Sequence, residues 1–439
     1  MGAFVPHTAA EQQEMLRAIG LDSFDGLYAD VPAGVRLTEP LPLPAGMSEL
    51  EARRAMEDIA AENLRFRHIF RGAGAYNHYI PAIVKAVVSK EEFVTAYTPY
   101  QAEISQGVLQ SIFEYQTMIC DLTGMDVSNA SVYDGCTAAA EAAAMCRDRK
   151  RGVVLLSAAV HPDVKKTVAT YCFGSGAPLV TVPEKDGRTD LAALKELLTD
   201  QTACFCFQQP SFFGCIEDAD AICALVHEAG AKLVMGVNPM ATALLKTPGE
   251  VGADIAVGEG QPLGMPLSFG GPYLGFMAAA GALVRKLPGR IVGQTTDDQG
   301  RRSFVLTLQA REQHIRREKA GSNICSNEAL CALTATAYLA AMGPEGFREA
   351  ARQSVSKAHY LADKLAGAGL RRLHSGPFFH EFVTVSDVPA EDLLAVLEGR
   401  GYLGGLPVGG HEILWCATEL NTAGEIDELA AIVKEVTHA

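Results

Sequence analysis

A short glycine turn and one histidine are the residues whose types and positions best suit a bound cofactor. Asp134-Gly135-Cys136-Thr137 open an alanine-rich segment that reads as a helix, and the free N–H groups of a helix start can hold a phosphate. His161 follows the apolar run VVLLSAAV, where its ring could stack on a planar cofactor. Both features also have a plain structural interpretation, as an ordinary helix cap and as a structural or vestigial histidine.

A second group of polar side chains lies in the loop TAYTPYQAEISQG (95–107). Two phenols and an amide flank a rigid proline there, directly before a long amphipathic segment that predicts a helix over 108–124. Loops held by a rigid scaffold often carry contacts to ligands or partners. The candidate residues are Tyr97, Thr98, Tyr100 and Gln101, and Glu103 either joins them or caps the helix that follows.

The stretch AREQHIRREK (310–319) concentrates positive charge, with Arg311, Arg316 and Arg317 close together. It is expected to form a helix. Glu312 lies four residues before Arg316, a spacing that favours a solvated, ion-paired helix face. The alternative is a surface that binds an anion or an acidic partner.

Other motifs are missing. The sequence has no GxGxxG after a predicted strand, no GxxxxGK[ST] and no GxSxG, which removes the usual signals of a nicotinamide site, a P-loop and a hydrolase elbow. None of the 11 cysteines forms a CxxC pair, so no zinc-ligand spacing is present. We expect no metal site, and most cysteines are expected to be buried, reduced thiols.

Alternating strands and helices must position these residues. Buried strands are predicted at 153–157, 178–182, 203–209, 232–237, 254–260 and 273–278, with helices at 162–172, 190–199 and 217–229. This pattern predicts an α/β domain with a doubly wound, mostly parallel sheet.

The flanking segments predict two further parts. Thr8 and Glu11 form a capping-box pattern, and Ser48 caps a helix that reaches about Asn63. We therefore expect an N-terminal helical arm with the interface loop over 1–130 and a large α/β domain over 131–327. A connecting helix and a small α+β domain are expected over 328–439.

A helical arm, an α/β domain and a small C-terminal lobe are the layout of many pyridoxal-phosphate (PLP) enzymes. Such an enzyme needs an Asp at the end of a central strand, to hold the pyridine nitrogen protonated, and a Lys roughly 20–30 residues later, to form the Schiff base. The strand KLVMGVNPM ends at Asn238, and no lysine lies within 247–285. The sequence therefore predicts a body of this type that does not hold PLP by itself.

The composition of the chain argues against nucleic-acid binding and against a membrane protein. Lys and Arg number 37 against 52 Asp and Glu, a net charge of −15, which opposes binding to the phosphate backbone of nucleic acid. No apolar stretch reaches about 18 residues, so no membrane span is predicted, and the N-terminus lacks a signal-peptide pattern. We expect a cytoplasmic protein.

Five blocks of the chain resemble the P-protein family of the glycine cleavage system, and together they span essentially its whole length: 70–84, 95–143, 289–304, 304–351 and 418–429. The resemblance implies a PLP-dependent transferase-like (fold type I) large domain. In split P-proteins it points to subunit 1, the N-terminal-half chain, because the other half carries a His-Lys pair where this chain reads GEGQPLG (258–264). Gly321 and Cys136 depart from the Thr and Ala that are common in the family.

The resemblance implies glycine dehydrogenase (aminomethyl-transferring), an oxidoreductase that works with a second chain. Glycine loses its carboxylate as CO2, and its aminomethyl group passes to the lipoyl arm of H-protein. PLP would be covalently bound on subunit 2, in an α2β2 heterotetramer, and this chain would supply no catalytic residue alone.

Three site assignments follow from the resemblance. Tyr97, Thr98, Tyr100, Gln101 and Glu103 would complete the partner's site, or only pack the interface. Tyr133, Asp134 and His161 would line a vestigial pocket, and Arg311, Arg316 and Arg317 would dock an anion or the carrier protein. Two rival hypotheses are an autonomous PLP transferase or lyase with an unusual lysine, and a noncatalytic chain that stabilises or regulates subunit 2.

Overall fold

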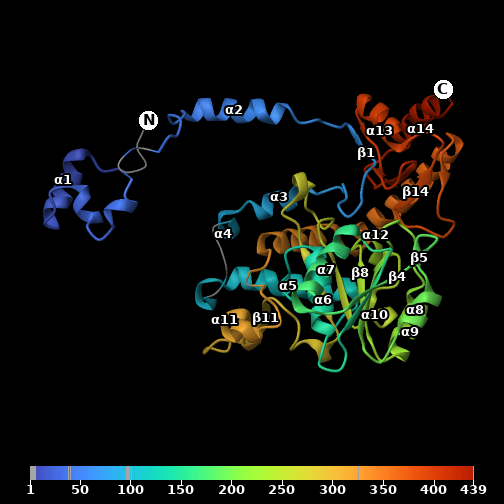
Figure 1. Cartoon of the computed structure of the whole chain (residues 1–439), viewed down its shortest axis with the longest axis horizontal. Coiled ribbons are helices and arrows are strands. Elements are labelled where there is room, and N and C mark those ends of the chain that lie inside the picture. The colour runs from blue at the N-terminus through green and yellow to red at the C-terminus, as the bar shows by residue number, and fades with distance from the viewer. Residues whose placement is uncertain are drawn as a thin grey trace. The chain divides into compact units, whose positions relative to one another are not determined.

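The computed structural model describes residues 6–37, 39, 41–94, 99, 101–324 and 326–438, and the chain divides into two compact units, Met1–Arg65 and Phe66–Ala439. The first unit holds α1 (Ala9–Ala18) and α2 (Glu49–Ala61) (Figure 1). Thr8 forms the predicted capping box with Glu11, and Ser48 forms another with Glu51. Among the described residues of this unit only Leu16 is buried, so the unit has no hydrophobic core of its own.

The second unit is built on a seven-stranded sheet of order β2-β10-β9-β8-β7-β3-β4. Five neighbouring strands run parallel, and β10 is antiparallel to both β9 and β2. The strands are β2 (Val127–Ser128), β3 (Val153–Ser157), β4 (Leu179–Val182), β7 (Thr202–Gln209), β8 (Lys232–Val237), β9 (Ile255–Glu259) and β10 (Gly275–Ala279). The predicted, mostly parallel α/β sheet is therefore confirmed.

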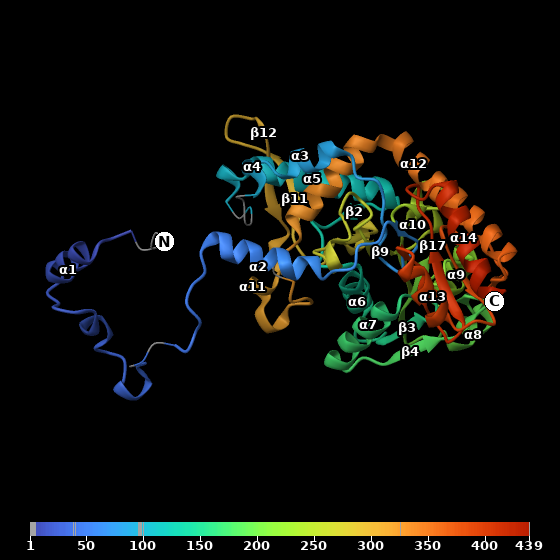
Figure 2. The same ribbon diagram turned by 90° about the horizontal axis from the view of Figure 1, so that it is seen from above.

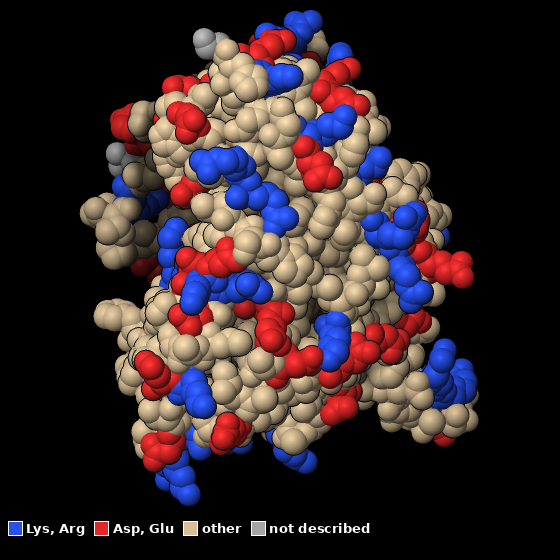
Figure 3. All heavy atoms as spheres, turned by 90° about the vertical axis from the view of Figure 1, so that its right-hand side faces the viewer, with Lys and Arg blue, Asp and Glu red and all other residues tan. Residues whose placement is uncertain are grey.

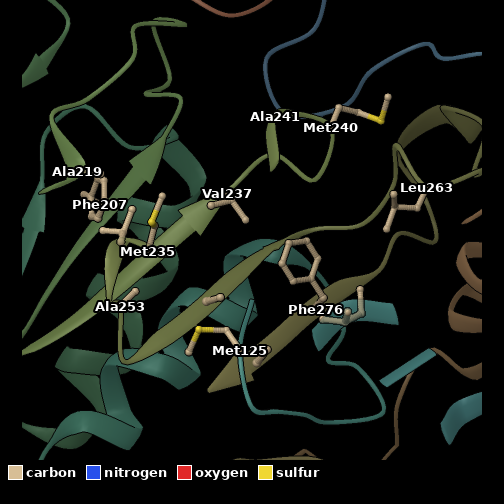
Figure 4. Packing of buried hydrophobic residues seen from close by; sticks show 14 of the residues in the cluster. Met125, Phe207, Ala219, Met235, Val237, Met240, Ala241, Ala253, Leu263 and Phe276 are labelled. Carbon is tan, nitrogen blue, oxygen red and sulfur yellow. The ribbon is translucent and has the colours of Figure 1, made fainter. Parts of the chain in front are cut away.

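Both faces of this sheet are buried, which explains why its strands read as continuous apolar runs. Phe205 and Phe207 pack on one face, while Cys204 and Cys206 point to the other. Figure 4 shows part of the first face, where Phe207, Met235 and Phe276 pack. The helices on that face are α5 (Gln106–Thr123), α9 (Ala219–Glu228) and the first part of α12, and those on the other are α6 (Gly135–Cys146) and α7 (Pro162–Ser175).

The helix α12 (Ala329–Gly367) joins the large sheet to the C-terminal lobe (Figure 2). It breaks at Gly343, which has a φ of 61° and lies directly before Pro344, a residue that interrupts helices. The lobe contains an antiparallel sheet of order β13-β14-β17-β16. Its elements are β13 (Arg371–Arg372), β14 (Glu381–Val385), β16 (Leu406–Pro407), β17 (Glu412–Cys416), α13 (Ala390–Gly399) and α14 (Ala423–Thr437).

The basic stretch 310–319 is not one helix, contrary to the prediction. It forms three single turns, η7 (Gln309–Arg311), α11 (Gln313–Arg316) and η8 (Arg317–Lys319), after the hairpin β11 (Ile291–Thr296) and β12 (Arg302–Thr307). Arg317 has a φ of 54°, which no continuous helix allows. The carboxylate of Glu312 is buried and lies 3.7 Å from Arg290, so the expected Glu312–Arg316 pair on a solvated face is absent from the described residues.

The predicted domain boundaries at 130 and 327 stay a prediction. Within the part of the chain that the structure describes, no helix combines the length and apolarity needed to cross a membrane, and no group of three or more His, Cys, Asp or Glu side chains is placed to hold a metal ion.

Candidate functional site

A cavity of ≈ 590 Å³ opens at the carboxyl ends of the parallel strands. Ligands of open α/β sheets usually bind at this edge. Residues at or just beyond the ends of β7, β8 and β9 line it, together with the first turns of α6 and α7 and the segment 73–76. Tyr133, Asp134 and His161 all line this cavity, so the three residues predicted to share a pocket do lie together.

The first turn of α6 is the predicted phosphate cradle, and the chain's own carboxylates occupy it. Asp134 is the N-cap, and its Oδ1 accepts a hydrogen bond from Thr137 N at 2.7 Å. The N–H of Gly135 donates to Glu259 Oε2 at 3.0 Å. A Cβ on Gly135 would lie 2.9 Å from Glu259 N, so only glycine allows the helix start to approach β9 this closely.

Glu259 bridges three backbone segments around the cavity. Besides Gly135, its carboxylate accepts hydrogen bonds from Gln261 N at 3.0 Å and from Leu274 N at 2.9 Å. Burial raises the pKa of Glu259, and the three backbone donors oppose that rise. A carboxyl group of the chain itself therefore stands at the positive end of α6, where a ligand phosphate would otherwise bind.

The ring of His161 is fixed by two hydrogen bonds. Its Nδ1 accepts from Asp163 N at 3.1 Å and so caps α7, and its Nε2 lies 2.9 Å from the carbonyl oxygen of Ala73. Because that carbonyl only accepts, Nε2 carries the proton. The ring also meets Phe212 edge-on at 5.2 Å. These contacts agree with the structural interpretation of His161.

Asn238 follows β8, where the sequence offered no carboxylate. Its Oδ1 accepts from Met240 N at 2.9 Å, and its Nδ2 lies 3.3 Å from His380 Nε2. Burial lowers the pKa of His380 well below its ordinary value, so this neighbour is a neutral ring at neutral pH. Asn238 therefore closes a local turn.

The charges around this cavity all have one sign. Among the described residues, the lining includes the carboxylates of Asp134, Asp163, Glu259 and Glu328 but no lysine and no arginine. Burial raises the pKa of the Cys136 thiol to about 12, and the nearby carboxylates add to the effect, so this cysteine is not an activated nucleophile. An anionic ligand would meet electrostatic repulsion here.

A buried carboxylate that no sequence motif indicated ties the cavity rim to the C-terminal lobe. Glu381 accepts hydrogen bonds from Ala73 N at 2.6 Å and from the hydroxyl of Tyr76 at 2.8 Å. Burial raises its pKa to about 7. A Cβ on Gly72 would collide with the Glu381 carboxylate, so the glycine-rich run RGAGAY was the available signal.

The structure describes only some of the other residues that were predicted to form sites. Tyr97, Thr98 and Tyr100 lie outside the described residues. Gln101 and Glu103 are exposed, and the α5 N-cap, Ser105, makes no side-chain cap hydrogen bond. Arg311 and Arg316 line a second cavity, whereas Arg317 does not.

The strand order, the antiparallel β10 and the cavity at the strand ends define a fold type I α/β protein, the class that contains the PLP-dependent transferases. Two solved structures share this fold. A sphingosine-1-phosphate lyase from Burkholderia pseudomallei K96243 has a TM-score of 0.67 and 15% identity over 93% of this chain and 95% of that one. A NifS-like protein has a TM-score of 0.62 and 14% identity over 84% of this chain and 99% of that one. At such low identity, these two similarities support the fold and nothing about function.

The chain belongs to the glycine cleavage system P-protein family, whose model matches residues 2–433. A crystal structure of glycine decarboxylase (P-protein) of the glycine cleavage system, in inhibitor-bound form, has a TM-score of 0.94 and 43% identity over 99% of this chain and all of that one. The predicted family and fold class are confirmed.

Two curated relatives are similar over nearly their full length. One, from Moorella thermoacetica, is 52% identical over 99% of both chains. The other, from Carboxydothermus hydrogenoformans, is 51% identical over 98% of this chain and 99% of that one. Both are named probable glycine dehydrogenase (decarboxylating) subunit 1.

Proposed function

We propose that this chain is subunit 1 of a two-chain P-protein and that its partner, subunit 2, carries the covalently bound PLP. The complex would remove the carboxylate of glycine as CO2 and pass the aminomethyl group to the lipoyl arm of H-protein. The names of the relatives support the glycine-decarboxylating activity and the division into subunits. The proposal places the complex in the cytoplasm.

The residues that line the ≈ 590 Å³ cavity are the observation that supports placing PLP on the partner chain. PLP supplies an electron sink when it is bound, and it needs a lysine for attachment, a carboxylate for its ring nitrogen and donors for its phosphate. Here no lysine lines the cavity within the part of the chain that the structure describes, Asn238 stands at the end of β8, and Glu259 already takes the Gly135 donor. The residues present do not fit PLP, and a phosphate would face carboxylates.

The loop before α5 is proposed to complete the partner's site. Gln101 and Glu103 are exposed there, and the start of α5 is held firmly because the Gln106 amide donates to Phe304 O at 2.9 Å and accepts from Phe304 N at 2.8 Å. This anchored position suits residues that reach another chain. The proposed contacts to the partner's cofactor or to glycine are Tyr97, Thr98, Tyr100, Gln101 and Glu103.

The first unit is proposed to pack against the partner in an α2β2 complex. Its large apolar side chains are exposed, among them Ile19 (63%), Val35 (71%), Leu37 (78%), Leu43 (73%) and Leu64 (68%). Large apolar side chains exposed in such number on one unit favour a surface that packs against another chain. A subunit that has no core in its arm is expected to bury that arm in the complex.

Reconstitution tests the proposal. Co-purification with a candidate subunit 2 is followed by a glycine–bicarbonate exchange assay, which measures reversible decarboxylation, on each chain alone and on the mixture. We expect activity in the mixture only. Activity of this chain alone would favour an autonomous enzyme, whereas full activity of subunit 2 alone would leave this chain a stabilising or regulatory role.

A further inference from the structure

We propose that a second cavity in this chain binds a phosphate anion or a phosphate monoester. The cavity measures ≈ 430 Å³ and lies among the C-terminal end of α6, the segment 285–289 and the segment 311–324. Its lining holds two carboxylates and six cationic side chains, which are Arg147, Arg285, Lys286, Arg311, Arg316 and Lys319.

This gathering of cations contrasts with the rest of the molecule. The chain carries a net charge of −15, and on the face shown in Figure 3 basic and acidic side chains are interspersed. Six like charges around one concavity repel one another unless anions balance them. A balancing ligand is therefore the simplest reason for the arrangement.

Arg311 supplies the most specific contact. Its Nε and Nη2 atoms are buried and have no hydrogen-bond partner among the described residues. These two nitrogens form the edge of the guanidinium that grips a phosphate or carboxylate side-on with two parallel hydrogen bonds. Leaving such donors buried and unpaired is unfavourable, so Arg311 lacks an acceptor that an anion in the cavity would provide.

The two carboxylates of the cavity do not provide that acceptor. Glu141 Oε1 accepts from the hydroxyls of Ser322 at 2.9 Å and Tyr171 at 3.2 Å. Glu312 Oε2 lies 3.7 Å from Arg290 Nη1, and its Oε1 accepts no hydrogen bond within the described part of the chain. Glu141 is thus turned to other neighbours, whereas the charge of Glu312 also acts on Arg311. With six cations against these two acids, the lining stays cationic on balance.

Three more lining cations make no direct side-chain contact within the described chain, although the charge of Lys286 helps to lower the pKa of Asp148. Arg285, Lys286 and Lys319 make no side-chain hydrogen bond or ion pair with any residue that the structure describes. The Nε of Arg316 donates a hydrogen bond to the carbonyl oxygen of Ala310 at 3.0 Å. Its two Nη groups stay available to a ligand. Several converging cations match a multiply charged phosphate better than a single carboxylate, and a concave site suits a small anion better than a flat protein surface.

The test uses the purified full chain without subunit 2, so its result is independent of the proposed glycine chemistry. Inorganic phosphate and glycerol phosphate, which separate a free anion from a monoester, are titrated calorimetrically. The variant carries Arg285→Gln and Lys286→Gln, and Lys319→Gln serves if the double variant does not fold. The matched control is Arg149→Gln, which removes an exposed arginine outside the cavity.

We expect saturable binding of at least one of the two anions, weakened on the order of tenfold or more in the cavity variant and unchanged in Arg149→Gln. Absence of binding would overturn the proposal, and so would equal weakening in the control, which would mean general charge attraction. Binding of lipoylated H-protein that depends on these residues, without phosphate binding, would also overturn it and would identify a carrier-docking surface.

Discussion

The carboxylate of Glu259 accepts a hydrogen bond from the backbone N–H of Gly135 at 3.0 Å. The end of β9 is thereby joined to the first turn of α6 through a carboxyl group that belongs to the chain. Ligands of open α/β sheets usually bind at this edge, and here a fixed group of the chain itself occupies the start of the helix. Its consequences for stability and for the location of the cofactor can both be measured.

Replacing Glu259 by Gln is expected to destabilise the fold by about 1–3 kcal/mol. An amide keeps one acceptor oxygen and places an NH2 group against the backbone N–H of Gly135 or against those of Gln261 and Leu274. Urea unfolding of the isolated chain measures the change in the free energy of unfolding.

The control for this prediction is Glu196→Gln in α8 (Leu191–Leu197), where the side chain is exposed. A surface change of this kind is expected to stay within about 0.5 kcal/mol. If Glu259→Gln unfolds at the same urea concentration as this control, the carboxylate does not stabilise the start of α6.

Glu381 predicts a pH dependence of stability. Burial raises its pKa in the folded state to about 7, above the value of about 4.3 expected in the unfolded chain. The folded state therefore binds the proton more tightly, and the stability from this group is lost as the pH rises through 7. Glu381→Gln mimics the protonated form and should remove that part of the slope.

The free energy of unfolding is measured at pH 5.5 and pH 7.5 in the wild type and in Glu381→Gln. The wild type should lose about 1–2 kcal/mol more than the variant between these values. Glu217, whose pKa burial also raises to about 7, is present in both proteins and cancels in the comparison. Parallel slopes in the two proteins would show that Glu381 does not titrate in this range.

The main sheet could be predicted from the sequence because its central strands, β3, β7, β8 and β9, are buried on both faces. The runs at 153–157, 203–209 and 232–237 are mostly apolar, and the structure confirms all three as strands. The stretch 310–319 was mispredicted because Glu312 turns inward to Arg290, a residue 22 positions earlier. Local helical spacing does not report such a tertiary contact.

The sequence predicted which residues share the cavity, but not which groups they contact there. Tyr133, Asp134 and His161 do lie together, because strand ends and helix starts meet at one edge of a parallel sheet. The partners of these residues, Ala73 for His161 and Glu259 for Gly135, lie 88 and 124 positions away. A spacing argument cannot identify contacts over such separations, and the Tyr76–Glu381 contact, over 305 positions, was missed for the same reason.

The loop before α5 gives a functional prediction. In the reconstituted two-chain complex, Tyr100→Phe and Gln101→Ala are expected to lower the rate of glycine–bicarbonate exchange on the order of tenfold or more, since each removes a polar group proposed to reach the partner's site. Size-exclusion chromatography should show normal assembly, and Gln110→Ala, on the first turns of α5, serves as the control. Unchanged exchange with normal assembly would leave these residues only a packing role.

The central claim is that this chain does not hold the cofactor, and borohydride trapping followed by peptide mass spectrometry tests it most directly. Borohydride reduction permanently attaches PLP to whichever lysine holds it. In the reconstituted complex we predict a phosphopyridoxyl-lysine on a peptide of subunit 2 and none on any peptide of this chain. A modified lysine within this chain would contradict the account.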